Sequence, residues 1–305
     1  MSAARPLPHY LPAAFIGGFG IPNPRRTGGR YANVCMRRRD SATVAGPLPA
    51  EKVAAEFGVY DVERPTPSLP ADFADKLWEQ YEGALPTAAV ALESDGFTAQ
   101  HWEAILLHVQ AQSIRHPDFD RVATAYLGAR VPRDVIQEQR QITHRESRQL
   151  MSRARFAVLR RGNHAPRFLI NDKGYTSLLD LEFGARSVLF PLTGNVAVLM
   201  ATDAVQEGDD YEAGPYAVRR LNPKALRFVN GASWDQVNTR AVFGHPDDEQ
   251  TLVELQHTGQ LARLPLLGPY QGNREPGLLD WAFTFTEIRT RRERWLSNLG
   301  LSPPT

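Results

Sequence analysis

The fold of this chain depends on an N-terminal stretch, HYLPAAFIGGF, which runs from His9 to Phe19. It has the mildly apolar character of a secretory leader, but Pro12 and several glycines interrupt it. Arg25 and a second arginine then follow where a leader has small residues. We therefore expect the stretch to be an ordered part of the folded protein, with Phe15 and Phe19 packed in the core.

The composition outside this stretch is that of an ordinary globular protein. The 305 residues are 42% hydrophobic, and a net charge of +1 indicates no class of partner by itself. The one cysteine, Cys35, cannot form an internal disulfide and is typical of a reducing compartment, so we expect a cytoplasmic protein. No apolar run approaches the roughly 20 residues of a membrane helix, so we expect no membrane association.

Hydrophobic periodicity predicts helices first and most strands later along the chain. Helices are expected over residues 49–57, 72–81, 84–92, 98–115, 118–127, 134–153, 223–228, 233–242 and 247–261. Strands are expected over residues 31–38, 156–159, 167–170, 187–190, 196–200 and 281–288. Thr98 is a suitable N-cap for the helix that follows it, with His101 in the position where a capping box usually has Glu.

This order of elements predicts an α+β fold and not alternating βαβ units. We expect a helical N-terminal half packed on a small, mostly antiparallel sheet from the C-terminal half. No linker is flexible enough to require a boundary, so residues 1–305 are expected to form a single domain. Within it we distinguish an N-terminal motif segment (1–40), a helical block (70–153) and a sheet-containing block (155–290).

Arginine supplies nearly all of the positive charge, a bias typical of a GC-rich, bacterial-type genome. Residues 1–39 carry seven arginines and no acid, and residues 130–167 carry ten arginines against three acids. If the two arginine-rich stretches are neighbours in the fold, they form one surface for a polyanion. If they are not, they are two separate solvated faces.

The motifs of several common enzyme classes are absent. The chain has no GxxxxGK[ST] loop, no GxGxxG after a strand, no HExxH, no CxxC pair and no GxSxG. These absences disfavour the usual nucleotide cradles, zinc and redox sites, and serine hydrolases.

A polar stripe runs along the expected helix 98–115. At about 100° per residue, His101, His108, Gln112 and Arg115 fall within one narrow sector beside the apolar face. The stripe is therefore expected at the border of the buried face, where it would line a pocket. His101 and His108 are about 10 Å apart along the axis and cannot chelate one metal ion together. Alternatively, both are partly exposed without a role, and Arg115 is only a cation that suits a helix C-terminus.

Short segments in a fixed order resemble the motifs of a family known only as domain of unknown function 4238. His9–Phe19 is similar to its His-Tyr-x-Pro-x-x-Phe motif, and Gln112–Pro117 to its Gln-x-x-Arg-Thr-Pro helix end. The remaining similar segments are a strand over 31–38, a short helix over 53–60, Phe168–Asp172, Phe190–Leu192, and Asn230 with residues 238–244. The resemblance spans roughly residues 9–255.

One element departs from the family pattern. The Ser-Asp-Asn-Pro motif of the family is Asn171-Asp172-Lys173-Gly174 here, so only the aspartate is retained. Since the family has no reaction that can be carried over, the resemblance indicates positions and not chemistry.

Residues at these positions are of the types found in hydrolytic and phosphoryl-transfer sites. His9 would act as general acid or base, because its pKa lies near neutrality. Asp172 would orient His9 or bind a divalent metal ion, and Arg115 would clamp a phosphate through two parallel hydrogen bonds. Asn230 would hold an oxyanion or a substrate amide.

Three more residues complete the expected substrate-binding set: Gln112, which would support Arg115, together with Tyr10 and His108. The alternative is that these side chains are structural. In that case His9 and Tyr10 anchor the N-terminal segment by hydrogen bonds, and Asp172 forms a buried ion pair with Arg115.

The leading hypothesis is a nuclease-like hydrolase of a phosphate-bearing substrate, with a nucleic acid or another polyanion as its partner. A non-catalytic nucleic-acid or nucleotide sensor would account for the arginines equally well. A third hypothesis is an enzyme of specialised small-molecule metabolism, which rests only on the altered Ser-Asp-Asn-Pro element. The cofactor that the residues suggest is a divalent metal ion.

Overall fold

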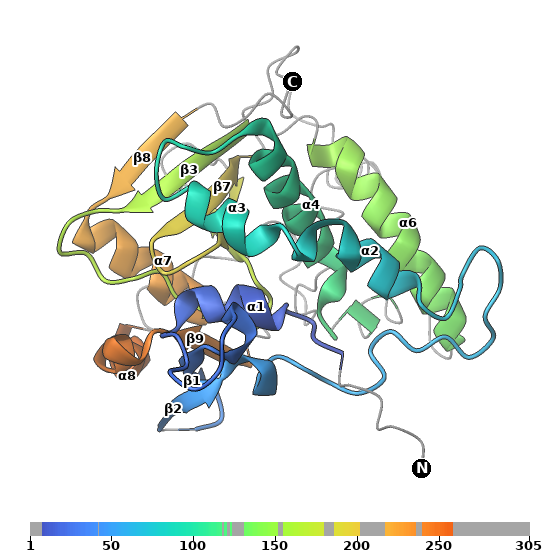
Figure 1. Ribbon diagram of the computed structural model, residues 1–305, viewed down its shortest axis with the longest axis horizontal. Coiled ribbons are helices and arrows are strands. Elements are labelled where there is room, and N and C mark those ends of the chain that lie inside the picture. The colour runs from blue at the N-terminus through green and yellow to red at the C-terminus, as the bar shows by residue number, and fades with distance from the viewer. Residues whose placement is uncertain are drawn as a thin grey trace, which may run out of the picture.

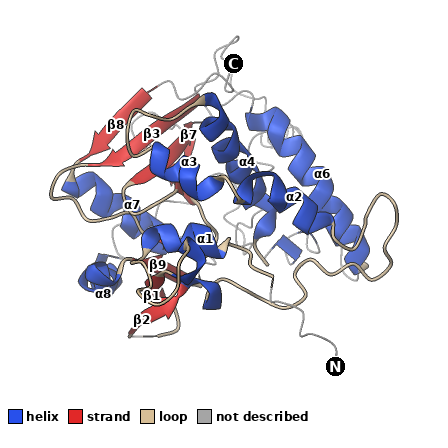
Figure 2. Ribbon diagram, viewed as in Figure 1, coloured by secondary structure: helices blue, strands red, loops and turns tan. Residues whose placement is uncertain are grey.

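The structure is a computed structural model. It describes residues 8–41, 43–117, 119–120, 123, 131–151, 155–179, 186–201, 217–235 and 240–258. Helices and two β-sheets are present, so the predicted α+β class is confirmed (Figure 2).

The helices of the described residues include seven α-helices and several 3-10 turns. The α-helices are α1 (Ala13–Ile16), α2 (Phe73–Glu82), α3 (Leu85–Ala91), α4 (Ala99–Arg115), α6 (Arg133–Met151), α7 (Pro223–Asp235) and α8 (Glu249–Thr258). The 3-10 turns are Gly17–Phe19, Gly29–Tyr31, Ala50–Lys52 and Pro246–Asp248.

The strands form one sheet of four and one of five. They are β1 (Asn33–Arg38), β2 (Val44–Pro49), β3 (Arg155–Arg161), β4 (Ile170–Asn171), β5 (Thr176–Leu179), β6 (Arg186–Pro191), β7 (Val196–Ala201), β8 (Ala217–Leu221) and β9 (Ala241–Gly244). The five-stranded sheet has the order β5-β6-β7-β3-β8, and only its β3–β8 pair is parallel. The four-stranded sheet has the order β2-β1-β9-β4 and is antiparallel throughout.

The four-stranded sheet corrects the predicted arrangement. We expected one sheet from the C-terminal half, but β1 and β2 come from the N-terminal part and pair with β9 and β4 from the other end of the chain. In Figure 1 this sheet lies at the lower left, below the five-stranded sheet. The helices α2, α4 and α6 lie at the upper right. A two-stranded hairpin is marginal by itself, so β1 and β2 need these distant partners.

Several local predictions were wrong. Residues 233–242 were expected to be helical, but α7 ends at Asp235 and the fully buried β9 begins at Ala241. The expected helix over 49–57 is only a 3-10 turn after β2, a strand that was not predicted. The strands β5 and β8 were also missed. The expected strand over 281–288 and most of the expected helix over 118–127 lie outside the described residues.

The capping prediction for α4 is confirmed. The hydroxyl of Thr98 accepts from the backbone N–H of His101 at 3.3 Å, and the Nδ1 atom of His101 accepts from the N–H of Thr98 at 3.2 Å. His101 thus takes the part that Glu plays in the usual capping box.

The N-terminal stretch is packed in the core, as predicted. Leu11, Phe15 and Phe19 are each at most 2% exposed, and burial of side chains of this size contributes roughly 1.5–3 kcal/mol each. The turn after α1 approaches other backbone closely: a Cβ added at Gly17 would lie 1.9 Å from the carbonyl oxygen of Gly29. The glycine is therefore required by close packing.

Candidate functional site

Three of the four residues of the polar stripe of α4 face the interior, while His101 is partly exposed. His108 and Gln112 are fully buried and Arg115 is 2% exposed, so the predicted position at a pocket border is wrong. The N-terminal stretch covers them, since the Phe15 ring packs on the His108 ring at 4.4 Å. Tyr81 of α2 packs on His108 from another direction at 5.7 Å.

The side chains of His108 and Gln112 are hydrogen-bonded to each other. The Gln112 amide nitrogen lies 3.1 Å from Nδ1 of His108, as their spacing of four residues allows. Burial and the nearby Arg115 lower the pKa of His108 well below its usual value, so its ring is neutral. These side chains support the docking of the N-terminal stretch, and neither one reaches the surface to bind a substrate as expected.

Arg115 clamps the backbone of the N-terminal stretch. Its Nη2 donates to the carbonyl of His9 at 2.8 Å and its Nε to the carbonyl of Tyr10 at 3.2 Å. Its Nη1 donates to the hydroxyl of Tyr81 and to the carboxylate of Glu82. The guanidinium that we expected to clamp a phosphate therefore holds the protein's own chain, and its acidic partner is Glu82 and not Asp172.

The ring of His9 is also hydrogen-bonded to the protein's own backbone. Its Nε2 lies 3.0 Å from the carbonyl oxygen of Glu51, and a ring nitrogen must carry hydrogen to make this bond. Burial lowers the pKa of His9, which favours the neutral ring. Among the hydrogen bonds of the described residues, none joins the His9 ring to Asp172, so the predicted His9–Asp172 pair does not form.

Asn230 is a structural cross-link. From α7, its side-chain oxygen accepts from the N–H of Leu169 at 3.0 Å, and its side-chain nitrogen donates to the carbonyl of Arg167 at 2.8 Å. The Asn230 amide therefore makes the two hydrogen bonds to residues 167–169 that a neighbouring strand would otherwise make. Both of its polar atoms are used by backbone, which corrects the expected role in substrate binding.

Asp172 has a different histidine as its partner. Its Oδ2 lies 3.2 Å from Nε2 of His116, the residue that directly follows α4. Both of its oxygens accept from the N–H of Arg240 at 3.1 Å. The Tyr10 ring meets the His116 ring edge to face at 5.3 Å. Asp172, His116 and Tyr10 are 0%, 1% and 9% exposed, and we call these three residues the Tyr10–His116–Asp172 cluster.

Sequence reasoning missed His116. The residue is part of the quoted Gln112–Pro117 segment, at the position where the motif that this segment resembles has threonine, and that difference was the available signal. Its partner is 56 residues away in the chain, so no local pattern could show the pair.

Strand pairing places cationic side chains beside this cluster. Arg38 ends β1 and is opposite Ala241, the first residue of β9, while the N–H of Asp172 bonds to the carbonyl of Ala241. Arg38, Arg240 and Asp172 therefore lie at one end of the neighbouring strands β1, β9 and β4, with Arg38 and Asp172 two strand spacings apart, about 10 Å. We call Arg38, Arg240 and the cluster together the sheet-edge site.

The sheet-edge site presents two cationic side chains at the surface, but Asp40, Glu56 and Asp172 outnumber them, so an anion binds there only by displacing an acid. The side chains of Arg38 and Arg240 are 58% and 50% exposed, and each makes an ion pair with an exposed acid, Asp40 or Glu56. Burial and the Asp172 carboxylate raise the pKa of Tyr10, so its hydroxyl keeps its proton and can donate a hydrogen bond. Exposed ion pairs are weak, so a phosphate can replace either acid.

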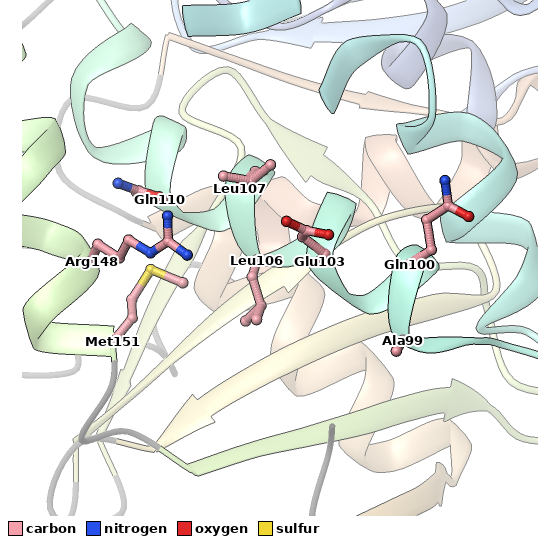
Figure 3. A pocket seen from close by; sticks show the side chains of 8 residues that line it. All are labelled: Ala99, Gln100, Glu103, Leu106, Leu107, Gln110, Arg148 and Met151. Atoms are coloured by element: carbon pink, nitrogen blue, oxygen red, sulfur yellow. The ribbon is translucent and has the colours of Figure 1, made fainter. Parts of the chain in front are cut away.

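A separate cavity lies between α4 and α6 (Figure 3). It has a volume of about 350 Å³, and its lining includes Leu106, Glu103 and Gln110 of α4 with Arg148 and Met151 of α6. At about 100° per residue, these α4 positions are on the side of the helix opposite His108. The cavity is therefore not part of the sheet-edge site.

No metal site is evident in the part of the chain that the structure describes, since no three His, Cys, Asp or Glu side chains gather there. None of the described helices is long and apolar enough to cross a membrane. Comparisons with protein-family models, curated proteins and solved structures found no match to this chain. The resemblance to family 4238 therefore stays a prediction.

Proposed function

We propose that this chain hydrolyses a phosphate-bearing substrate at the sheet-edge site, in the manner of a nuclease-like phosphodiesterase. The observation that carries the proposal is the contact of 3.2 Å between His116 and Asp172 beside two exposed arginines. A histidine held by a carboxylate is a common general base, and arginines are the preferred ligands of phosphate.

Each residue has a role in this proposal. In this proposal Nε2 of His116 donates its hydrogen to Asp172, and Nδ1 takes a proton from water once the contacts that bury the ring have opened. The hydroxide then bonds to phosphorus, the P–O bond to the leaving group breaks, and the leaving oxygen takes the proton back from His116. Arg38 and Arg240 offset the negative charge of the phosphate, and Tyr10 donates a hydrogen bond to one of its oxygens.

The burial of the cluster sets a condition on this mechanism. His116 is 1% exposed and its ring is in contact with Tyr10, so the Tyr10 ring must move before water and substrate reach Nδ1. The same burial favours a second candidate function, which is binding of a phosphate-bearing ligand by the arginines without chemistry.

The test is hydrolysis of the chromogenic diester bis(p-nitrophenyl) phosphate by the full chain and by His116→Gln. General base catalysis contributes about 100- to 10,000-fold, so we expect a loss of turnover in that range. The matched control is His164→Gln, which removes an exposed histidine and should keep wild-type turnover.

Urea unfolding of both variants separates chemistry from folding. A folded His116→Gln protein that retains turnover would overturn the proposed mechanism. A wild-type protein that binds phosphate esters but hydrolyses none would support the binding function instead. If His116→Gln does not fold, Asp172→Asn serves as the second variant, with the same expected loss.

A further inference from the structure

An exposed aromatic residue stands next to the sheet-edge site. Phe57 is 75% exposed, and the residue before it, Glu56, makes the ion pair with Arg240 at 3.1 Å. The other large hydrophobic side chains with high exposure, among them Val90 and Phe228, are on α3, α6, β8 and α7. Among the described residues, Phe57 is thus the highly exposed aromatic that directly follows the acid paired with Arg240.

The backbone holds this aromatic in place. Residues 54–56 run antiparallel to the N-terminal stretch, with hydrogen bonds from the N–H of Tyr10 to the carbonyl of Ala54 at 3.0 Å and from the N–H of Glu56 to the carbonyl of Pro8 at 3.1 Å. Ala54 has φ of 54° and Gly58 has φ of 72°. A left-handed alanine is unfavourable, so the surrounding contacts determine this conformation and present Phe57 to solvent.

Aromatic and cationic groups at one place match the chemistry of an unpaired nucleotide. A base offers a flat face that stacks on an aromatic ring, and the phosphate that joins it to the next nucleotide binds arginine. In a duplex the base faces are already stacked, so a single protruding ring selects single strands. Free phosphate would use Arg38 and Arg240 but gain nothing from Phe57.

We propose that the sheet-edge site binds single-stranded nucleic acid, with one base stacked on Phe57 and adjacent phosphates on Arg38 and Arg240. This inference rests on the proposed function, for which it names the substrate class. It also gives a role to the arginines at the end of β1, including Arg39, whose N–H bonds to the carbonyl of Arg240 at 2.9 Å.

The test is fluorescence anisotropy of the full chain with labelled 12-nucleotide oligo-dT and oligo-rU, and with a DNA duplex of the same length. Stacking of one base contributes about 1–3 kcal/mol, so Phe57→Ala should weaken binding of the single strands by about 5- to 150-fold. The matched control is Phe228→Ala, which removes an exposed phenylalanine beside Arg227 on α7 and should leave the affinity unchanged.

Arg38→Gln, with Arg219→Gln on β8 as its control, should reduce the dependence of the affinity on salt. Equal affinity for duplex and single strand, or an unchanged affinity in Phe57→Ala, would overturn the inference.

Its failure is distinguishable from that of the proposed function. If the wild type hydrolyses the diester but binds single strands equally well without Phe57, the inference is overturned and the proposed hydrolase remains. If binding depends on Phe57 but no hydrolysis is found, the nucleic-acid site is supported and the proposed hydrolase is contradicted.

Discussion

The two arginine-rich stretches differ in how many of their arginines are buried and in what the buried ones hold together. In residues 1–39, most of the described arginines are exposed, including Arg26, Arg30 and Arg38. In residues 130–167, Arg140 and Arg160 are buried, although Arg145 and Arg148 are exposed; in residues 1–39, Arg37 is buried. In Figure 1, α6 of the second stretch lies at the right of the molecule and β1 of the first stretch at the lower left. The separation is not complete, because a Cβ added at Gly58, next to Phe57, would lie 3.3 Å from Nη2 of Arg133 in the second stretch.

The buried arginines of the second stretch join elements of structure. Arg140 of α6 donates to the carbonyl of Ile114 at the end of α4 and to the carboxylate of Asp120. Arg160 of β3 donates to the carbonyls of Leu92 and Ser94 after α3. Cations are favoured at helix C-termini, so these arginines connect helix ends to their neighbours and do not bind partners. Composition cannot separate such arginines from exposed ones.

The largest expected effect is at Arg140. Arg140→Met should lower the free energy of unfolding, by about 1–3 kcal/mol for each of the buried acceptors of Ile114 and Gln137 that lose their donor. Urea unfolding measures it, with Arg145→Met, an exposed arginine of the same helix, as the control. Equal stability of the two variants would contradict the structural role.

The buried His144 of the same stretch makes the stability of the protein depend on pH. Burial and the charge of Arg148 lower the pKa of His144 to about 4, whereas an unfolded histidine titrates near 6.5. The unfolded chain therefore binds a proton first on acidification, and stability is lost as the pH falls from about 6.5 to 4. The loss is up to roughly 3 kcal/mol.

His144→Gln should remove this part of the pH dependence of the urea midpoint, while His164→Gln, at an exposed position, should keep it. A slope between pH 4 and 6.5 that is the same in His144→Gln and in the wild type would contradict the assignment.

An intermediate effect is expected at Arg160. Its guanidinium makes hydrogen bonds of 2.8 Å and 2.6 Å to the carbonyls of Leu92 and Ser94, and one of 2.7 Å to Asp95. Arg160→Met should lower the free energy of unfolding by about 1.5–3 kcal/mol. The control is Arg219→Met on the adjacent strand β8, whose side chain is exposed. A larger loss for Arg219→Met would show that capping by Arg160 is unimportant.

The smallest effect on stability is expected in the first stretch. Arg38 pairs with Asp40 at the surface, and exposed pairs contribute little. Arg38→Met should therefore keep the wild-type urea midpoint while it weakens binding of single-stranded oligonucleotides. If its midpoint falls as far as that of Arg160→Met, the contrast between the two stretches is wrong.

Much of the local structure could be predicted from the sequence. The periodicity of α2, α3, α4 and α6 predicted those helices, and Thr98 predicted where α4 begins. The candidate site was only partly predictable. Tyr10 and Asp172 were chosen, but His116 was not, and Arg115 had the wrong acidic partner. Each error concerns a contact between residues that are far apart in the chain, where periodicity and capping carry no signal.

What the sequence determined by itself is the set of local elements and the anchoring of the N-terminal stretch. Phe15 and Phe19 are large apolar side chains that gain free energy in any buried environment, so their burial follows from their chemistry. Which polar groups meet inside the protein is another matter, because a buried donor needs one particular acceptor. Only the tertiary structure, by pairing β1 with β9 and bringing the end of α4 to Asp172, decided that His116 meets Asp172 beside exposed Arg38.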